Sequence, residues 1–173
     1  EIFGRYDLLA APVTVTADGL RMLVGIYAFT IQIYGDFSGY TDMSRGIARL
    51  LGFNTMLNFN LPYFSVTPGV FWRRWHISLS TWLRDYLYIP LGGNKCSKMK
   101  MYRNTMITML LGGLWHGASW TFVLWGGYHG FLLVLYRVLG IEEKASQYPS
   151  WMKLIHGFIT FNLIAFGWLF FRA

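Results

Sequence analysis

Two histidines, each directly after a tryptophan, are the residues best suited to chemistry in this sequence. His116 lies in the segment Gly112-Gly-Leu-Trp-His-Gly-Ala-Ser-Trp120, within a run from Asn104 to Tyr136 that contains no Lys, Arg, Asp or Glu. A histidine in a low-dielectric pocket stays neutral more readily than one in water, so it can take a proton from a bound hydroxyl group. We interpret His116 as a candidate general base that faces a pocket.

A second candidate centre surrounds His76, in the segment Phe71-Trp-Arg-Arg-Trp-His-Ile-Ser-Leu-Ser80. We expect supporting roles for Ser80 and for Trp75 and Trp115, whose indoles would wall the pocket and exclude water. Asp36 directly follows an apolar run, where an unpaired carboxylate is costly. Asp36 is therefore expected to bind a cation, to orient a histidine or to pair with an arginine.

Each histidine also has a structural interpretation. His116 would then bond a neighbouring helix, since polar side chains hold membrane helices together. His76 would be an interfacial residue on an indole-rich helix. His129 is expected to be a contact between helices, and His156 an interfacial side chain near the start of the last apolar run.

Other site chemistries have less support. His76, His116 and Asp36 are metal ligands in principle, but they lack HExxH or another close ligand spacing, so we expect no metal. Ser119 is near His116 but lacks the Gly-x-Ser-x-Gly elbow of a serine hydrolase. The sequence has no phosphate-binding glycine loop, which leaves ATP-driven transport unsupported.

The composition indicates an integral membrane protein. Of the 173 residues, 54% are hydrophobic, 19% aromatic and only 13% charged, which lies outside the usual range of soluble domains. We expect no nucleic-acid partner for so apolar a chain, whereas the net charge of +7 favours contact with anionic membrane lipid. Cys96 is the only cysteine, which excludes an intrachain disulfide. A basic loop is assigned to the cytoplasm by the positive-inside rule and contains Lys95, Lys98, Lys100 and Arg103.

The apolar runs and helix breakers predict an all-α, polytopic membrane protein with interfacial amphipathic helices, in one membrane domain over 1–173. Thr67 is an expected N-cap, with Pro68 in the first turn after it. Because the chain starts without methionine and stops directly after an apolar run, we expect an internal piece of a larger protein. Membrane spans are expected at about 20–37, 104–138 (broken near 112–117) and 151–171, and interfacial helices at about 38–51 and 69–88.

Four segments together carry a family resemblance. They are Tyr34-Gly-Asp-Phe-Ser-Gly-Tyr40, Phe71-Trp-Arg-Arg-Trp-His-Ile-Ser-Leu-Ser80, Leu83-Arg-Asp-Tyr-Leu-Tyr-Ile-Pro-Leu-Gly-Gly-Asn94 and Gly113-Leu-Trp-His-Gly-Ala-Ser-Trp120. In this order they closely resemble the bacterial membrane-bound O-acyltransferases, specifically the alginate O-acetylation branch, over about residues 20–140. The D-alanyl transfer protein of teichoic acid synthesis is a relative with similar Trp-His pairs.

The resemblance implies a multi-helix core around a tunnel, in a multi-pass protein of the bacterial cytoplasmic (inner) membrane. An acyl group, acetyl in the first instance, would come from a cytoplasmic thioester donor such as acetyl-CoA or an acyl carrier, with no bound cofactor. It would pass to hydroxyls of an exported or cell-surface polysaccharide such as alginate, or to a downstream periplasmic or extracellular acetyltransferase. By the resemblance, His116 matches the catalytic histidine and His76 a second polar position, while Asp36 matches a supporting position.

Three alternatives stay open at this point. The same chemistry would serve D-alanyl transfer to teichoic acid. A transporter that relays protons through buried histidines would need paired titratable groups along several spans, but the predicted spans nearly lack carboxylates. A structural subunit of an export complex would leave His116 replaceable.

Overall fold

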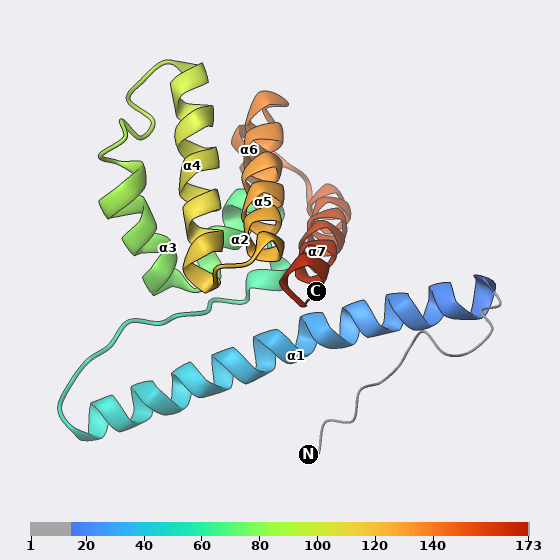
Figure 1. Cartoon of the computed structure of the whole chain (residues 1–173), viewed down its shortest axis with the longest axis horizontal. Helices are drawn as coiled ribbons and strands as arrows, with labels where there is room; N and C mark the ends of the chain where they lie inside the picture. Colours follow the sequence, from blue (N-terminus) through green and yellow to red (C-terminus); the bar gives the residue numbers. More distant parts are fainter. Residues whose placement is uncertain (1–14, 173) are drawn as a thin grey trace.

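The computed structural model describes residues 15–172, and over this range the protein is all-α without a strand. The predicted all-α fold is therefore confirmed. Figure 1 shows α4, α5 and α7 grouped together, with α2 and α3 beside them and the long α1 running crosswise below the group. The elements are α1 (Val15–Leu50), η1 (Pro62–Phe64), α2 (Pro68–Arg74), α3 (Ile77–Leu83), the π-helical turn η2 (Arg84–Tyr88), α4 (Lys98–His116), α5 (Trp120–Val138), α6 (Ile141–Lys144), η3 (Ala145–Gln147) and α7 (Ser150–Arg172).

Helices α4 and α5 form an antiparallel hairpin whose turn directly follows His116. Residues 117–119 separate the two helices, and the Ser119 hydroxyl caps α5 by accepting a backbone hydrogen bond of 3.3 Å. The break thus falls at the end of the stretch 112–117 where we expected it, and the glycine pair 112–113 lies inside α4. The turn places His116 at the end of the hairpin that meets the C-terminal end of α7.

Glycines allow the backbones of α4 and α5 to touch. A Cβ atom at Gly126 would collide with the backbone carbonyl oxygen of Met109, and one at Gly113 with that of Phe122. Small residues at such contacts are a common way for membrane helices to pack closely. Gly113 therefore serves helix packing and does not interrupt α4.

Replacing Gly126 by alanine is expected to destabilise the hairpin. The added methyl group must push two backbones apart, and overpacking costs about 1–3 kcal/mol, which exceeds the roughly 1 kcal/mol that alanine gains over glycine in a helix. The neighbouring Gly127→Ala variant is a matched control, because its Cβ would meet only the Leu110 side chain, at 3.5 Å. In thermal unfolding of the full-length protein, Gly126→Ala should melt below wild type and Gly127→Ala at or above it. Equal unfolding temperatures of the two variants would contradict close packing of the α4 and α5 backbones.

Helix α1 is one continuous helix of 36 residues, in place of the separate elements expected at 20–37 and 38–51. Asp42 and Arg45 lie one turn apart on it and form an ion pair of 3.2 Å. Hydroxyl groups near the expected break bond to carbonyls of the preceding turn instead of capping a new helix, and they belong to Ser38, Thr41 and Ser44. The polar residues after 37 therefore change the surface of the helix without ending it.

The segment expected as one helix at 69–88 is interrupted at Trp75 and His76. Thr67 caps α2 as predicted, since its hydroxyl accepts a backbone hydrogen bond of 3.2 Å. Trp75 has an extended backbone and inserts its indole into the core, where the residue is 4% exposed. Trp75 is thus buried at a corner of the chain, whereas Trp82 of the same segment is 54% exposed, a difference that helical periodicity does not reveal.

An aromatic core joins α2, α5, α7 and the segment before η1. Its buried members are Phe59, Phe71, Trp75, Trp125, Ile164 and Trp168. Helix α1 is fastened to α7 by a hydrogen bond of 2.6 Å from the Tyr27 hydroxyl to Asn162 Oδ1. This core supports the histidines, because Trp75 directly precedes His76 and the Trp125 ring contacts that of His116.

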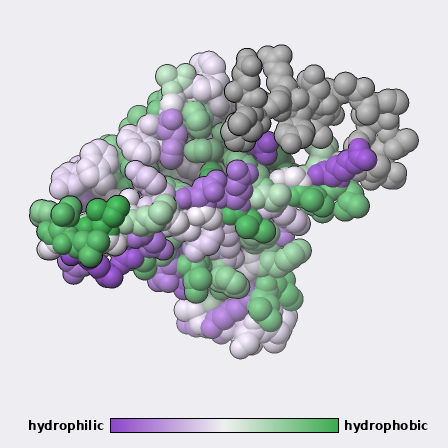
Figure 2. Space-filling view, turned by 90° about the horizontal axis from the view of Figure 1, so that it is seen from below, coloured by the Kyte–Doolittle hydropathy of each residue, from purple (hydrophilic) through white to green (hydrophobic). Residues whose placement is uncertain are grey.

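Helix length and exposed apolar surface agree with a membrane setting. Helix α7 is long and apolar enough to cross a bilayer, and α5 with the short helices after it is a second candidate if their 70° bend lies within one span. Helix α1 exposes Leu20, Ile31 and Ile47, and Figure 2, which views the α1 side, shows apolar areas among polar ones. Lipid or further protein normally covers such surface. The spans expected at 20–37 and 104–138 stay predictions.

Candidate active site

His116 ends α4 and lies among aromatic rings from three helices. The centroid of its imidazole is 5.1 Å from that of Trp125 on α5, 5.1 Å from that of Phe171 on α7 and 5.0 Å from that of Trp115. The residue is half-buried. The candidate base is therefore part of an apolar wall and keeps a portion of its surface open.

His76 occupies the corner between α2 and α3 in a backbone conformation that few residues with a side chain adopt. Its φ of 43° and ψ of 56° lie in the left-handed region, which costs roughly 1–2 kcal/mol outside glycine. Its ring centroid is 4.7 Å from that of Phe37 on α1 and 6.1 Å from that of Trp115. Such strain persists only where the surroundings impose it, and it clusters at functional sites.

Both histidines line one cavity of about 550 Å³, formed by α1, the corner at 75–76 and the ends of α4, α5 and α7. Its wall is otherwise aromatic or aliphatic, apart from Gln32 and one carboxylate. The structure brings together all but Ser80 of the six side chains predicted to act at the site, namely Asp36, Trp75, His76, Trp115 and His116. Their chemical roles stay predictions, but the shared cavity makes joint action possible.

The environment of His76 keeps its imidazole neutral. Burial, together with a smaller effect of the nearby His116, lowers the pKa of His76 to about 4. At neutral pH one ring nitrogen of His76 therefore donates a hydrogen bond and the other accepts one. No three His, Cys, Asp or Glu side chains among residues 15–172 are close enough together to hold a metal ion.

Ser80 lies away from the larger cavity, whereas Asp36 lines it. The Ser80 hydroxyl donates to the carbonyl of Trp75 at 3.0 Å, so it braces the corner that carries His76 and lines a different cavity. Asp36 is exposed on the wall of the larger cavity, and no ion pair joins it to another residue of the range 15–172. Within the described residues, Asp36 thus has no arginine partner of the kind considered from the sequence.

The other two histidines lie outside the larger cavity. His129 is fully buried, with ring centroids 5.2 Å from Trp72 and 5.0 Å from Trp125, which agrees with the expected contact between helices. His156 is half-buried on α7, where its ring lies 4.8 Å from that of Tyr148. His129 is thus part of the core, whereas His156 is expected to tolerate substitution more readily because it is only half-buried.

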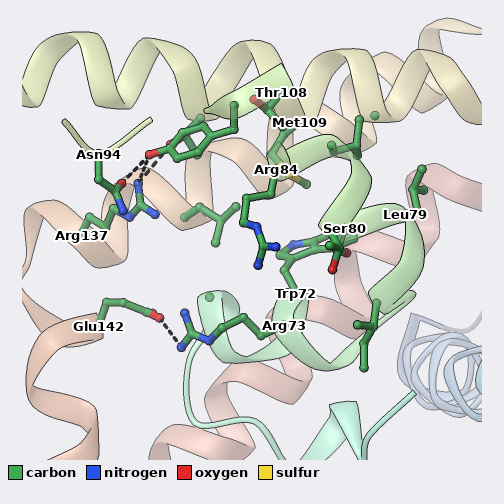
Figure 3. Close-up of a pocket in the computed structure, with 18 of the residues that line it drawn as sticks. Trp72, Arg73, Leu79, Ser80, Arg84, Asn94, Thr108, Met109, Arg137 and Glu142 are labelled. Atoms are coloured by element: carbon green, nitrogen blue, oxygen red, sulfur yellow. Dashed lines mark hydrogen bonds and ion pairs between the residues drawn. The ribbon is translucent and has the colours of Figure 1, made fainter. Parts of the chain in front are cut away.

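A second cavity, of about 340 Å³, lies between α3, α4 and α5. It shares His116 and Trp125 with the larger cavity, so these two side chains stand where the two spaces meet. One acidic side chain, Glu142, lines it. Figure 3 shows arginines from three elements reaching into it, namely Arg73, Arg84 and Arg137. The excess of positive charge attracts anions to this cavity.

The three arginines differ in how their charge is balanced. Arg73 and Arg84 each pair with a carboxylate, at 3.1 Å and 2.7 Å. Arg137 instead donates to the hydroxyl groups of Tyr88 and Thr105, both at 3.2 Å. Neutral hydroxyls orient a guanidinium without cancelling its charge. Arg137 is therefore the best placed of the three to bind an anion.

The two cavities lie toward opposite ends of α7. Glu142, on the short helix before α7, lines the smaller cavity, whereas Trp168 and Phe171, near the C-terminal end of α7, line the larger one. Of the four basic residues expected in one loop, only Lys95 lies in the loop before α4, and Lys98, Lys100 and Arg103 lie in the first turns of α4. In Figure 1 this loop and the start of α4 are at the same end as α6. The smaller cavity therefore faces the basic end of the molecule.

The sequence did not point to the smaller cavity. Arg73 and Arg84 fit the charged face of an interfacial helix, and Arg137 fits a polar connection after an apolar run. Trp125 carries no signal that separates it from the other indoles. The abrupt return of charge at Arg137, directly after an uncharged run, is the one local signal that could have drawn attention to it.

Comparison with known proteins places this chain in a family. The sequence profile of the membrane-bound O-acyltransferase family (MBOAT) matches residues 13–171. The chain belongs to the membrane-bound O-acyltransferase family, which confirms the resemblance and shows that it is part of a membrane protein.

The relatives include three kinds of transferase. The chain is 53% identical over 150 residues to the probable alginate O-acetylase AlgI of Pseudomonas aeruginosa. The aligned region covers 87% of this chain and 28% of that protein. It is 44% identical over 146 residues to the peptidoglycan O-acetyltransferase of Helicobacter pylori, with 84% and 28% covered. The teichoic acid D-alanyltransferase of Bacillus subtilis is 30% identical over 179 residues, with 97% and 45% covered. The chain thus spans less than a third of the length of the first two relatives.

Proposed function

We propose that this chain forms the catalytic centre of a membrane O-acyltransferase that transfers an acyl group, acetyl in the first instance, to hydroxyls of an exported or cell-surface polysaccharide such as alginate. The names of the alginate and peptidoglycan relatives support this acceptor class. The observation that carries the proposal is the place of His116, which lines both an arginine-bearing cavity and a cavity with a second histidine. Two substrates can therefore approach one base from two directions.

In the proposed reaction, neutral His116 takes the proton of an acceptor hydroxyl group. The oxygen of that hydroxyl group attacks the carbonyl carbon of a thioester at the same time. The new C–O bond forms, the C–S bond breaks, and the proton passes from the imidazolium to the leaving thiolate. His76, which lines the same cavity, donates a hydrogen bond that orients the acyl group or polarises its carbonyl. General acid–base catalysis of this kind contributes about 10²- to 10⁴-fold.

The donor enters from the smaller cavity in this proposal, and the acceptor reaches His116 from the larger one. The smaller cavity faces the basic end of the molecule, which the positive-inside rule assigns to the cytoplasm. The proposed donors, acetyl-CoA or an acyl carrier, bear phosphate groups, and arginine is well suited to bind phosphate. In this proposal the full-length protein is a multi-pass protein of the bacterial inner membrane and is surrounded by lipid.

Arg137→Gln should weaken use of the donor without disabling the chemistry. Loss of one charge-assisted hydrogen bond costs about 1.5–3 kcal/mol, and because Arg137 is only half-buried we expect the low end, about a tenfold higher KM for the donor. Inverted membrane vesicles with the full-length protein, supplied with radiolabelled acetyl-CoA as the probe donor, measure this KM. Arg137→Lys, which keeps the charge, should lie between Arg137→Gln and wild type. An unchanged KM in Arg137→Gln would remove Arg137 from the donor site.

The proposed function is tested by labelling in cells. Cells that express the full-length gene receive radiolabelled acetate or radiolabelled D-alanine, and the label released from extracellular polymer by mild base is counted. We expect gene-dependent acetyl esters. Gene-dependent D-alanyl esters would instead favour the alternative suggested by the teichoic acid relative. Ester formation that does not depend on the gene would favour a transporter or a scaffold of an export complex.

A further inference from the structure

The non-helical segment between α1 and η1 holds the corner that carries His76. The backbone N–H of Asn60 donates to the carbonyl of Arg74, the last residue of α2, at 3.0 Å. The N–H of Ile77, the first residue of α3, donates to the carbonyl of Asn58 at 2.9 Å. These two bonds fix the backbone on both sides of His76.

Asn58 also caps α3 with its side chain. Its Oδ1 accepts hydrogen bonds from the backbone N–H of Ser78 (3.1 Å) and from the Ser78 hydroxyl (3.0 Å). The residue at the N-cap position itself is His76, and its imidazole makes no capping bond. The first N–H groups of a helix need a partner, and here a different part of the chain supplies it. The imidazole of His76 is thereby left free to face the larger cavity.

The neighbour of Asn58 anchors this arrangement in the core. Phe59 is 7% exposed, and its ring centroid lies 4.9 Å from that of Trp75 and 5.0 Å from that of Phe37. Phe37 in turn contacts the imidazole of His76. One short segment therefore fixes both the backbone of His76 and the ring against which its side chain packs.

From these contacts we propose that Asn58 is a positioning residue, which holds the left-handed backbone of His76 so that its imidazole lines the same cavity as His116. The proposal rests on the proposed function, because it gives His76 a part in the transfer. Without the bonds from Asn58, α3 loses the cap that lets it start after the corner. His76 can then relax to an ordinary backbone conformation, which turns its ring away from the cavity.

The test uses the full-length gene and the initial rate of radiolabelled acetate incorporation into polymer esters, divided by the amount of protein in the membrane. Asn58→Ala should lower this rate about 10- to 100-fold, as expected when a reacting group is displaced by about 1 Å. Asn58→Asp should stay within about threefold of wild type, because a carboxylate accepts both bonds and suits a helix N-terminus. The control is Thr67→Ala, which removes the cap of α2 and leaves that of α3.

Each other outcome overturns the proposal. A normal rate in Asn58→Ala shows that His76 does not need this cap. An equal loss in Asn58→Asp, or in Thr67→Ala, shows that stability of the fold and not the placement of His76 was lost. If His76→Ala and His116→Ala also acetylate at the normal rate, the proposed function itself fails. If these two variants lose activity while Asn58→Ala keeps it, only the role of Asn58 is rejected.

Discussion

Replacement of His116 by alanine should lower polymer acetylation by about 10²- to 10⁴-fold, because the proposed reaction loses its general base. The protein should still reach the membrane in normal amount. His116 is the last residue of α4 and is half-buried, while the packing of α4 on α5 depends on glycines farther along the two helices. The measurement is the rate of labelled acetate incorporation per amount of membrane-inserted protein.

The best control for this variant is His156→Ala. His156 lies on the part of α7 remote from the larger cavity, which α7 lines with residues near its C-terminal end. His129→Ala would be a poor control, since His129 is fully buried among the rings that support Trp125. A normal rate for His116→Ala, or an equal loss for His156→Ala, would contradict a catalytic role of His116.

Loss of the His76 imidazole should lower the acetylation rate by about 10²- to 10³-fold, the range observed when one donor to a developing negative charge is removed. His76→Gly is the informative variant. Glycine adopts the left-handed backbone of this position without a steric cost, so the variant removes the side chain and keeps the corner. His76→Ala removes the same ring but keeps the backbone strain.

The two His76 variants should therefore have similar low rates but different stabilities. In thermal unfolding, His76→Gly should melt at or above His76→Ala, because alanine in the left-handed region is strained. A near-normal rate of acetylation in His76→Gly would show that the corner matters and the imidazole does not. Recovery of activity by free imidazole added to vesicles with His76→Gly would strengthen the assignment.

The sequence drew attention to the two histidines of the candidate site. His76 and His116 are the two of the four histidines that directly follow a tryptophan, and the family resemblance gave them their expected roles. Asp36 stood out because a carboxylate directly follows an apolar run there, and all three side chains line one cavity. Their closeness in space was not predictable from local pattern, because α1, the corner at 75–76 and the end of α4 are far apart in the sequence.

The break at His76 could not be read from helical periodicity. The bonds that cause it come from Asn58, in a segment whose asparagines and proline indicate only a loop. The sequence also predicted a helix boundary in α1 that the structure does not have. A change from apolar to charged residues suggested a boundary, whereas hydroxyl groups bonded within the helix allow it to continue. The arginines of the smaller cavity likewise become a set only when α2, η2 and α5 come together.

The central claim, that two substrates reach His116 from opposite faces of the membrane, is tested most directly by sided cysteine labelling. In a full-length protein in which Cys96 and every other cysteine are replaced by serine, Gln32→Cys marks the larger cavity and Asn94→Cys the smaller one. A membrane-impermeant maleimide is applied to spheroplasts and to inverted vesicles that carry the full-length protein. We predict that position 32 reacts in spheroplasts and position 94 in inverted vesicles. Reaction of both positions from the same face would contradict the account.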